Sequence, residues 1–294
     1  MKAHLIRFLE EYTYTPEDTA LLLNTYDKIM ENPETAALWQ QALSLYEASI
    51  DCDYAKILEL ADTVSERMPG VHAYTTNLLV YLCMTKHTAE VYQQRGLDEA
   101  LFKNTMLDLR YKLEECKAVK GICGSFVAGW FAGFFALTRF AFGRLQFEIS
   151  NFDRHYEKDG KVLTPQSKVI NIHIPRTQTP LTPESCDDAF RQAAAFFKGA
   201  LDGPCVFHCH SWLLFPEHDH ILSPKSNTYR FMKRFDLFES GYYKHIEELW
   251  RLFDTQEQNP DRLPADSGMR RAYVEHLKNG GKTGWGAGIF FYEP

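Results

Sequence analysis

The sequence has no excess of positive charge, because 32 Lys and Arg residues against 39 Asp and Glu give a formal net charge of −7. Proteins that bind nucleic acid normally present a basic surface to the phosphates, so we expect no nucleic-acid partner. The chain also lacks a disulfide framework, because its seven cysteines are odd in number and show no short paired spacing. Such cysteine usage is typical of a reduced, cytoplasmic protein.

Signals for secretion or membrane insertion are also scarce. Residues 1–12 include Lys2, Arg7, Glu10 and Glu11 and have no apolar signal core. Only one long uncharged run is present, the 18 residues 121–138, which reach the lower limit for a membrane span. Because this run contains four glycines and no second apolar segment supports it, we expect no membrane span. We interpret the run as a buried helix between two domains.

The chain is longer than a usual single domain and its two halves have different periodicities. Residues 1–120 show helical spacing only, with capping side chains before proline at Thr15-Pro16 and Asn32-Pro33. From Arg144 onward, short β runs alternate with helical segments. The sequence therefore predicts an α+β protein with an all-α N-terminal domain over 1–120 and a mixed α/β sheet domain over 121–294.

A strand–helix–strand unit forms the centre of the second half. Residues 168–175 alternate as a strand, with the isoleucines on one face and Val169, Asn171 and His173 on the other. Thr182-Pro183 predicts the capped start of a helix, and residues 205–214 predict a second strand. Two strands joined by one helix should be parallel neighbours. Further strands are expected at 145–149 and 289–292, a hairpin turn at 158–161, and helices at 227–235 and 269–278.

Several local strings carry a family resemblance that spans the whole chain. They are GRLQFE at 143–148, HIP at 173–175, PLTP at 180–183, and SWLL at 211–214 followed by Pro216. These strings resemble a bacterial family of two-domain acyltransferases, in which a helical N-terminal acyltransferase domain precedes a GNAT-like domain. The resemblance implies transfer of an acyl group from acyl-CoA to an amine or hydroxyl of a small-molecule or peptide acceptor. It does not indicate the oligomeric state.

The same resemblance implies where coenzyme A binds. In GNAT enzymes, a loop and the following helix N-terminus hold the pyrophosphate, and the two parallel strands splay to admit the thioester. In this sequence the implied residues are Ile174, Arg176, Thr177, Gln178, Thr179, Leu181, Thr182 and Asn227. The chain departs from the usual pattern because its loop has no glycine, and because Pro180 removes one amide donor.

Direct acyl transfer needs a base for the attacking nucleophile and an acid for the leaving thiolate. His173 lies at the end of the first parallel strand, His210 lies on the second, and Glu148 lies on an adjacent strand. Histidine titrates near neutral pH, which suits a general base. Tyr229 is the candidate acid, by analogy with a tyrosine that many GNAT enzymes place on the corresponding helix.

Three other interpretations stay open at the level of sequence. The glycine-free loop is compatible with a GNAT-like interaction scaffold that has lost catalysis. His208, His210, His218 and His220 lie within 13 residues and define a possible metal-binding protein, although no CxxC pair accompanies them. Cys209 is a possible nucleophile, but on a strand its side chain faces away from both neighbouring histidines.

Overall fold

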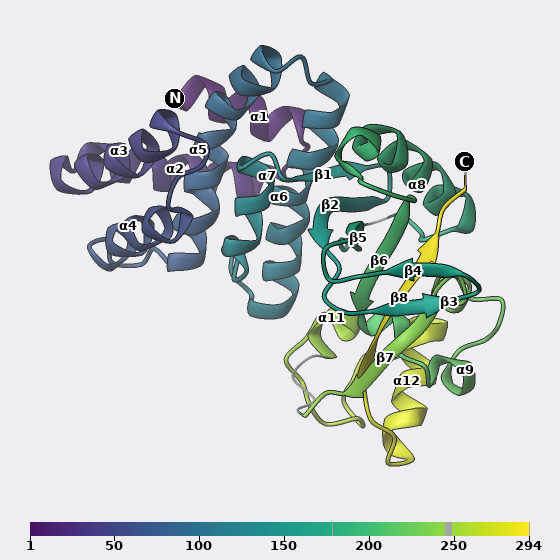
Figure 1. Ribbon diagram of the computed structural model, residues 1–294. Coiled ribbons are helices and arrows are strands. Elements are labelled where there is room, and N and C mark those ends of the chain that lie inside the picture. The colour runs from purple at the N-terminus through teal and green to yellow at the C-terminus, as the bar shows by residue number, and fades with distance from the viewer. Residues whose placement is uncertain (178, 245–248, 294) are drawn as a thin grey trace. The chain divides into compact units, whose positions relative to one another are not determined.

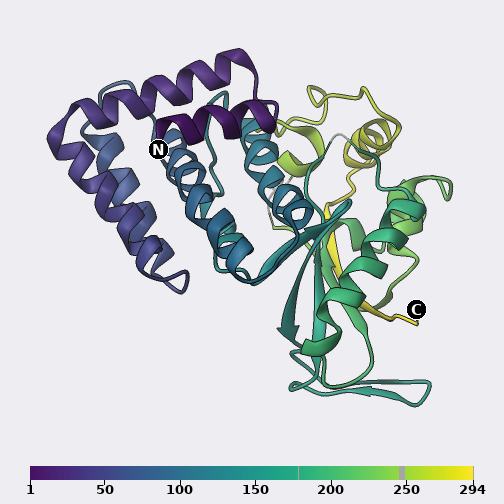
Figure 2. The same ribbon diagram turned by 90° about the horizontal axis from the view of Figure 1, so that it is seen from above.

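The computed structural model describes residues 1–177, 179–244 and 249–293. By contacts, the chain divides into two compact units, residues 1–140 and 141–294. The helices of the N-terminal unit are α1 (Lys2–Glu11), α2 (Pro16–Glu31), α3 (Pro33–Ala48), α4 (Tyr54–Glu66), α5 (Ala73–Gln94), α6 (Glu99–Lys120), the 3₁₀ turn η1 (Ala128–Phe131) and α7 (Ala132–Phe135). Successive helices of this unit pack side by side (Figure 2).

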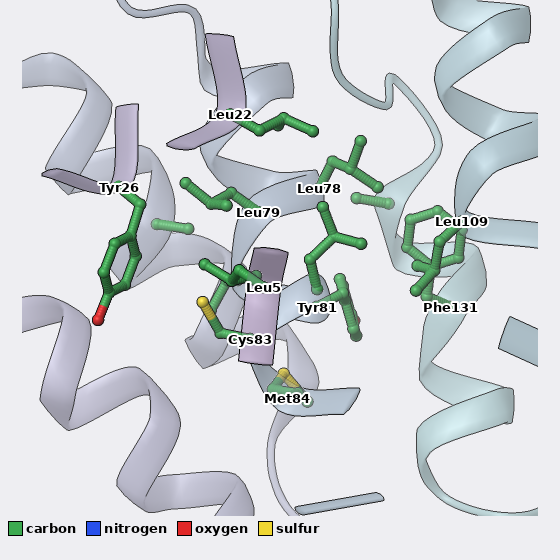
Figure 3. Packing of buried hydrophobic residues seen from close by; sticks show 14 of the residues in the cluster. Leu5, Leu22, Tyr26, Leu78, Leu79, Tyr81, Cys83, Met84, Leu109 and Phe131 are labelled. Carbon is green, nitrogen blue, oxygen red and sulfur yellow. The ribbon is translucent and has the colours of Figure 1, made fainter. Parts of the chain in front are cut away.

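Side-chain caps mark the helix starts that the sequence predicts. Thr15 accepts a hydrogen bond from the backbone N–H of Asp18, and Asn32 accepts one from that of Glu34. Each cap satisfies an amide that has no partner inside its helix. Helix α5 is buried over most of its length and contributes Leu78, Leu79 and Tyr81 to the core in Figure 3.

The apolar run 121–138 is not the continuous helix that we expected. Its first residues form bends and turns against the start of α5, where the Ser125 N–H donates to the Tyr74 carbonyl over 2.9 Å. A side chain at Gly124 would bring its Cβ within 2.4 Å of the Tyr74 backbone, so only glycine fits this approach. A regular helix would not allow this contact. The run continues as η1 and α7 and then leads into a strand.

The boundary between the two units also differs from the expected position near residue 120. Phe131, Phe134 and Phe135 are fully buried in the core of the helical unit. The apolar run is therefore part of that core, and the unit extends to residue 140. Hydrophobic burial moves the boundary, because these three aromatic side chains would otherwise be left in water.

The C-terminal unit is built on a six-stranded sheet of order β1-β2-β5-β6-β8-β7 (Figure 1). The strands are β1 (Arg139–Phe142), β2 (Leu145–Asn151), β5 (Lys168–His173), β6 (Val206–Ser211), β7 (Asp236–Tyr242) and β8 (Gly284–Phe291), with β3 (Tyr156–Lys158) and β4 (Lys161–Leu163) as a separate ribbon. The parallel pairing of β5 with β6 and the hairpin at 158–161 confirm the predictions. Strands β1 and β7 were not predicted.

The two faces of this sheet are covered differently. Helix α8 (Pro183–Phe197) packs on one face, where Phe190 contacts the rings of Phe147, Phe207 and Phe290. The opposite face carries the β3–β4 ribbon over part of its area, and a small core forms there from Phe152, Leu163, Val169, Val206 and Ile289. The remaining area of that opposite face holds polar side chains.

Shorter elements complete the C-terminal unit. They are η2 (Lys198–Ala200), η3 (Trp212–Leu214), α9 (His218–Ile221), α10 (Asn227–Met232), α11 (Trp250–Phe253) and α12 (Gly268–Lys278). The last four helices contribute to a second apolar cluster around Leu222, Leu252 and Tyr273. Throughout 1–177, 179–244 and 249–293, no helix is both long and apolar enough to cross a membrane.

Because the apolar run is buried, truncating one of its large side chains should destabilise the protein. Replacing Phe131, which is 0% exposed, by alanine should lower the free energy of unfolding by about 3–5 kcal/mol. The cost arises from lost burial and from the cavity left behind. Urea unfolding followed by circular dichroism measures it, with Phe196→Ala, a change at a 39% exposed ring, as the control. Equal effects of the two changes would contradict the placement of Phe131.

Candidate active site

The sheet opens between its two parallel strands. Pairing of β5 with β6 ends at Asn171 and His208, whereas β5 stays paired with β2 up to His173. Strand β6 likewise stays paired with β8 up to Ser211. The outer ladders therefore continue where the central one stops, which leaves a V-shaped opening at the carboxyl ends of β5 and β6. Beyond these two residues, β5 and β6 are not in register with each other in the described part of the chain.

Glu148 and His173 form a close pair at one arm of the opening. The Nε2 atom of His173 lies 2.6 Å from Oε1 of Glu148, and the two side chains are 20% and 21% exposed. Both project from the same face, because Glu148 is in register with Asn171 and His173 lies two residues further along β5. The structure thus brings together two of the four predicted catalytic residues.

Asn171, which the sequence analysis did not select, continues this polar row. Its Nδ2 atom lies 3.2 Å from Nε2 of His173, and its Oδ1 atom lies 3.2 Å from Nδ1 of His208. The row therefore runs across β2, β5 and β6 as Glu148, His173, Asn171 and His208. The available signal was the polar Asn171 on the strand face shared with His173, opposite a face of isoleucines.

The ring of His208 is held among aromatic side chains. It stacks on Phe238 with a centroid separation of 6.0 Å and meets the edge of Phe152 at 6.0 Å. Burial lowers the pKa of His208 to about 4, while the nearby Asp153 carboxylate opposes this shift. Loss of hydration disfavours the charged imidazolium, so His208 is neutral at physiological pH.

His210 and Tyr229, the other two predicted catalytic residues, have different surroundings. His210 is on the β6 arm, exposed, with its ring 4.5 Å from that of Trp285. Tyr229, near the start of α10, packs against the second apolar cluster, and the Lys233 ammonium lies over its ring. Trp285 is a further aromatic side chain at the opening that sequence reasoning missed.

The loop from Ile174 to Thr182 follows β5 and leads into α8. The Arg144 guanidinium donates hydrogen bonds to the carbonyls of Pro175 (2.8 Å) and Thr179 (2.9 Å). Because a trans peptide directs its C=O and N–H oppositely, the Arg176 N–H points away from Arg144. The side chain of Thr182 caps α8 by accepting a hydrogen bond from Ser185, as predicted.

The positive charge of Arg176 in this loop is partly neutralised by a carboxylate that the sequence did not reveal. Arg176 forms an ion pair with Asp254, with 2.9 Å between Nε and Oδ1, and Arg270 lies 2.6 Å from the other oxygen of the same carboxylate. Asp254 follows α11 in the chain, so no local pattern could reveal this pairing. Two guanidinium groups, those of Arg144 and Arg176, nevertheless adjoin the loop, which suits a polyphosphate.

The other predicted cofactor residues have mixed settings. Thr177 and Thr179 are joined through their hydroxyls over 2.9 Å, and Leu181 is buried. Ile174 is half-buried, and Asn227 is the first residue of α10. Gln178 lies outside the described residues.

The geometry disfavours two alternatives: a metal site formed by the four histidines from His208 to His220, and a nucleophilic Cys209. His218 is fully buried and bonded to the Tyr273 hydroxyl and the Leu213 carbonyl, so it does not face the other histidines. Within the described part of the chain, no three His, Cys, Asp or Glu side chains converge as metal ligands. Cys209 is buried, and burial raises its thiol pKa well above the usual range, which disfavours the nucleophilic thiolate.

Comparison with family models accounts for both units. Residues 3–137 match the N-acyltransferase N-terminal domain, and residues 139–290 match the GNAT-like C-terminal domain. The chain belongs to this family of two-domain acyltransferases. The match confirms the α+β fold class and the GNAT-type acyltransferase assignment that the local strings suggested. No curated protein is significantly similar to the chain in sequence.

Solved structures show the same fold over the full length. A crystal structure of an acyltransferase in complex with decanoyl-CoA and teicoplanin matches with a TM-score of 0.65 at 19% identity, covering 98% of this chain and 99% of that one. A structure of an acyltransferase with CoA and 10C-teicoplanin matches with the same TM-score and coverage at 18% identity. At these identities the likeness shows the fold alone. The fold is the one described above for this member of the GNAT-type acyltransferase family.

The setting of His208 predicts its titration. Its pKa should lie near 4 rather than at the usual value of about 6.5, because the buried ring resists protonation. The unfolded chain then binds a proton that the folded chain does not, so stability present above pH 6.5 should decline as the pH falls toward 4. NMR titration of the histidine ring signals measures the pKa. A midpoint near 6.5 for His208, assigned with a His208→Phe variant, would contradict the expected burial.

Proposed function

We propose that this acyltransferase moves an acyl group from acyl-CoA to an amine or hydroxyl of a small-molecule or peptide acceptor at the opening between β5 and β6. The single observation that carries the proposal is the Glu148–His173 pair at the point where the parallel ladder ends. An ionisable pair beside an open strand end offers a proton acceptor next to space for a thioester.

Glu148 sets the tautomer of His173. An ionised carboxylate accepts a hydrogen bond, so Nε2 carries the proton and donates it to Glu148 over 2.6 Å. The lone pair then lies on Nδ1, which makes Nδ1 the basic atom. When Nδ1 takes a proton, the resulting imidazolium is stabilised by the adjacent carboxylate. This division of roles follows the logic of an oriented histidine base.

The reaction follows from these positions. As the acceptor nitrogen or oxygen attacks the thioester carbonyl, its proton passes to Nδ1 of His173. The C–S bond then breaks, and the thiolate of coenzyme A leaves and gains a proton. We propose His210, exposed on the β6 arm, as the donor of that proton, with Tyr229 as the alternative acid.

Coenzyme A is proposed to lie along the loop after β5. Ile174, Arg176, Thr177, Gln178, Thr179, Leu181, Thr182 and Asn227 are the proposed contact residues, with the α8 N-terminus facing the pyrophosphate. The structurally similar acyltransferases were crystallised with decanoyl-CoA, octanoyl-CoA and teicoplanin. Medium-chain acyl-CoA donors and a glycopeptide amine are therefore the first substrates to test.

We place the reaction in the cytoplasm, where the seven free cysteines stay reduced.

Catalytic variants test the role of the pair. His173→Ala should lower kcat by about 10²–10⁴-fold, because the general base is lost, and Glu148→Gln should lower it less. Release of free thiol from decanoyl-CoA, with teicoplanin and a panel of amines as acceptors, measures turnover, and mass spectrometry identifies the product.

The matched control for this experiment is His220→Ala, which removes an exposed histidine on α9. It should leave kcat unchanged. Unaltered turnover in His173→Ala, with the protein folded, would show that the base lies elsewhere.

Ligand binding separates the enzyme from a GNAT-like interaction scaffold, the alternative kept open by the glycine-free loop. Calorimetric titration with coenzyme A and decanoyl-CoA should show saturable binding. Arg176→Ala should weaken it by about 10-fold or more, the usual cost of losing a hydrogen bond to a charged group. Arg271→Ala, at an exposed position on α12, is the control. Absence of binding by the folded wild-type protein would favour the scaffold.

A further inference from the structure

The closed end of the V-shaped opening is bridged by side chains as well as by the backbone. Asn171 and His208 are the last residues paired between β5 and β6, and they also contact each other through their side chains at 3.2 Å. Asn171 lies at the same distance from Nε2 of His173, the proposed base. One amide therefore touches both the point where the strands part and the histidine on one arm.

The protons of this row can be assigned by counting donors and acceptors. Nε2 of His173 carries one proton, which points to Glu148, so this atom cannot also accept a hydrogen bond from an amide N–H. In the structure the Nδ2 atom of Asn171 faces Nε2 of His173, and its Oδ1 faces Nδ1 of His208. Because Nε2 of His173 is protonated, we assign the amide rotated by 180°, with its oxygen facing Nε2–H. Its NH₂ group then faces Nδ1 of His208.

His208 can complete this arrangement only as a neutral ring with a lone pair on Nδ1. Its pKa, lowered to about 4 by burial, provides that state at physiological pH. The ring cannot easily turn away, because Phe238 stacks on it and Phe152 meets its edge. One set of donors and acceptors follows: Asn171 donates to His208, and the single Nε2–H of His173 is shared between the oxygens of Glu148 and Asn171.

We propose that Asn171 and His208 are positioning residues, which bridge the two parallel strands where they part and hold His173 with its proton on Nε2 and its lone pair on Nδ1. This inference rests on the proposed function of His173 as the base. Glu148 alone fixes one contact of the imidazole. The amide of Asn171, anchored by the aromatic-packed ring of His208, fixes the plane in which that imidazole lies.

Two substitutions at one position separate hydrogen bonding from packing. His208→Phe keeps an aromatic ring against Phe152 and Phe238 but removes Nδ1. His208→Asn removes the ring but keeps a hydrogen-bonding atom near the former Nδ1 position. Positioning predicts that His208→Phe lowers kcat by about 10- to 100-fold, the usual cost of a misplaced catalytic group. KM for decanoyl-CoA should change little, and His208→Asn should recover most of kcat.

A spectroscopic measurement on the full chain gives a readout independent of turnover. With ¹⁵N-labelled histidine, His173 should show one tautomer, with Nδ1 unprotonated, in the wild-type protein and in His208→Asn. His208→Phe and Asn171→Ala should each give a mixture of tautomers. The double variant should resemble either single variant, because the two residues act as a unit.

The outcomes distinguish this inference from the proposed function. Full activity and an unchanged His173 tautomer in His208→Phe, with a defect in His208→Asn, would assign His208 to packing alone and overturn the proposal. Additive losses in the double variant would also overturn it. If His173→Ala is fully active, the proposed base is wrong, yet the tautomer measurement still decides whether Asn171 and His208 orient the ring.

Discussion

The candidate site depends on one constraint, the early end of pairing between β5 and β6. The ladder stops at Asn171 and His208 while the flanking ladders continue, so the sheet must open there. Two parallel strands held on their outer sides cannot close over this gap, and their carboxyl ends meet at the same edge. That edge is where α/β folds generally place ligands, because polar ends and loops gather there. The Glu148–His173 pair lies on this edge.

One face of the sheet carries the aromatic core, and the opposite face carries the polar residues of the candidate site. On the α8 side, Phe190 and its neighbours form an aromatic core that holds the strands in place. On the opposite side, the β3–β4 ribbon covers an apolar area around Val169 and Val206 and leaves the rest polar. Strand alternation produces this division, because successive side chains point to opposite faces. A polar row can thus extend across three strands without interrupting the aromatic core.

Much of the fold was predictable from local patterns. The Thr182 cap, the alternation of residues 168–173 and the Asp159-Gly160 turn are local signals, and the structure confirms each of them. Strand β1 and the irregular path of residues 121–138 were not predictable, because an apolar run has the same composition in a buried helix and in an extended segment. Tertiary contacts, such as the close approach of Gly124 to Tyr74, accompany the irregular path.

For the site, the sequence by itself determined the residue types, their faces and the strand that carries each of them. Glu148 and His173 were identified by alternation and by family strings, whereas His208 was noted only as one of four clustered histidines. The tertiary structure decided the contacts. It pairs Glu148 with His173 and places the Asn171 amide beside them. It also forms the ion pair between Arg176 and Asp254. The physical reason is register. Sequence periodicity fixes which way a side chain points, whereas its neighbour across the sheet depends on the alignment of strands that are distant in the chain.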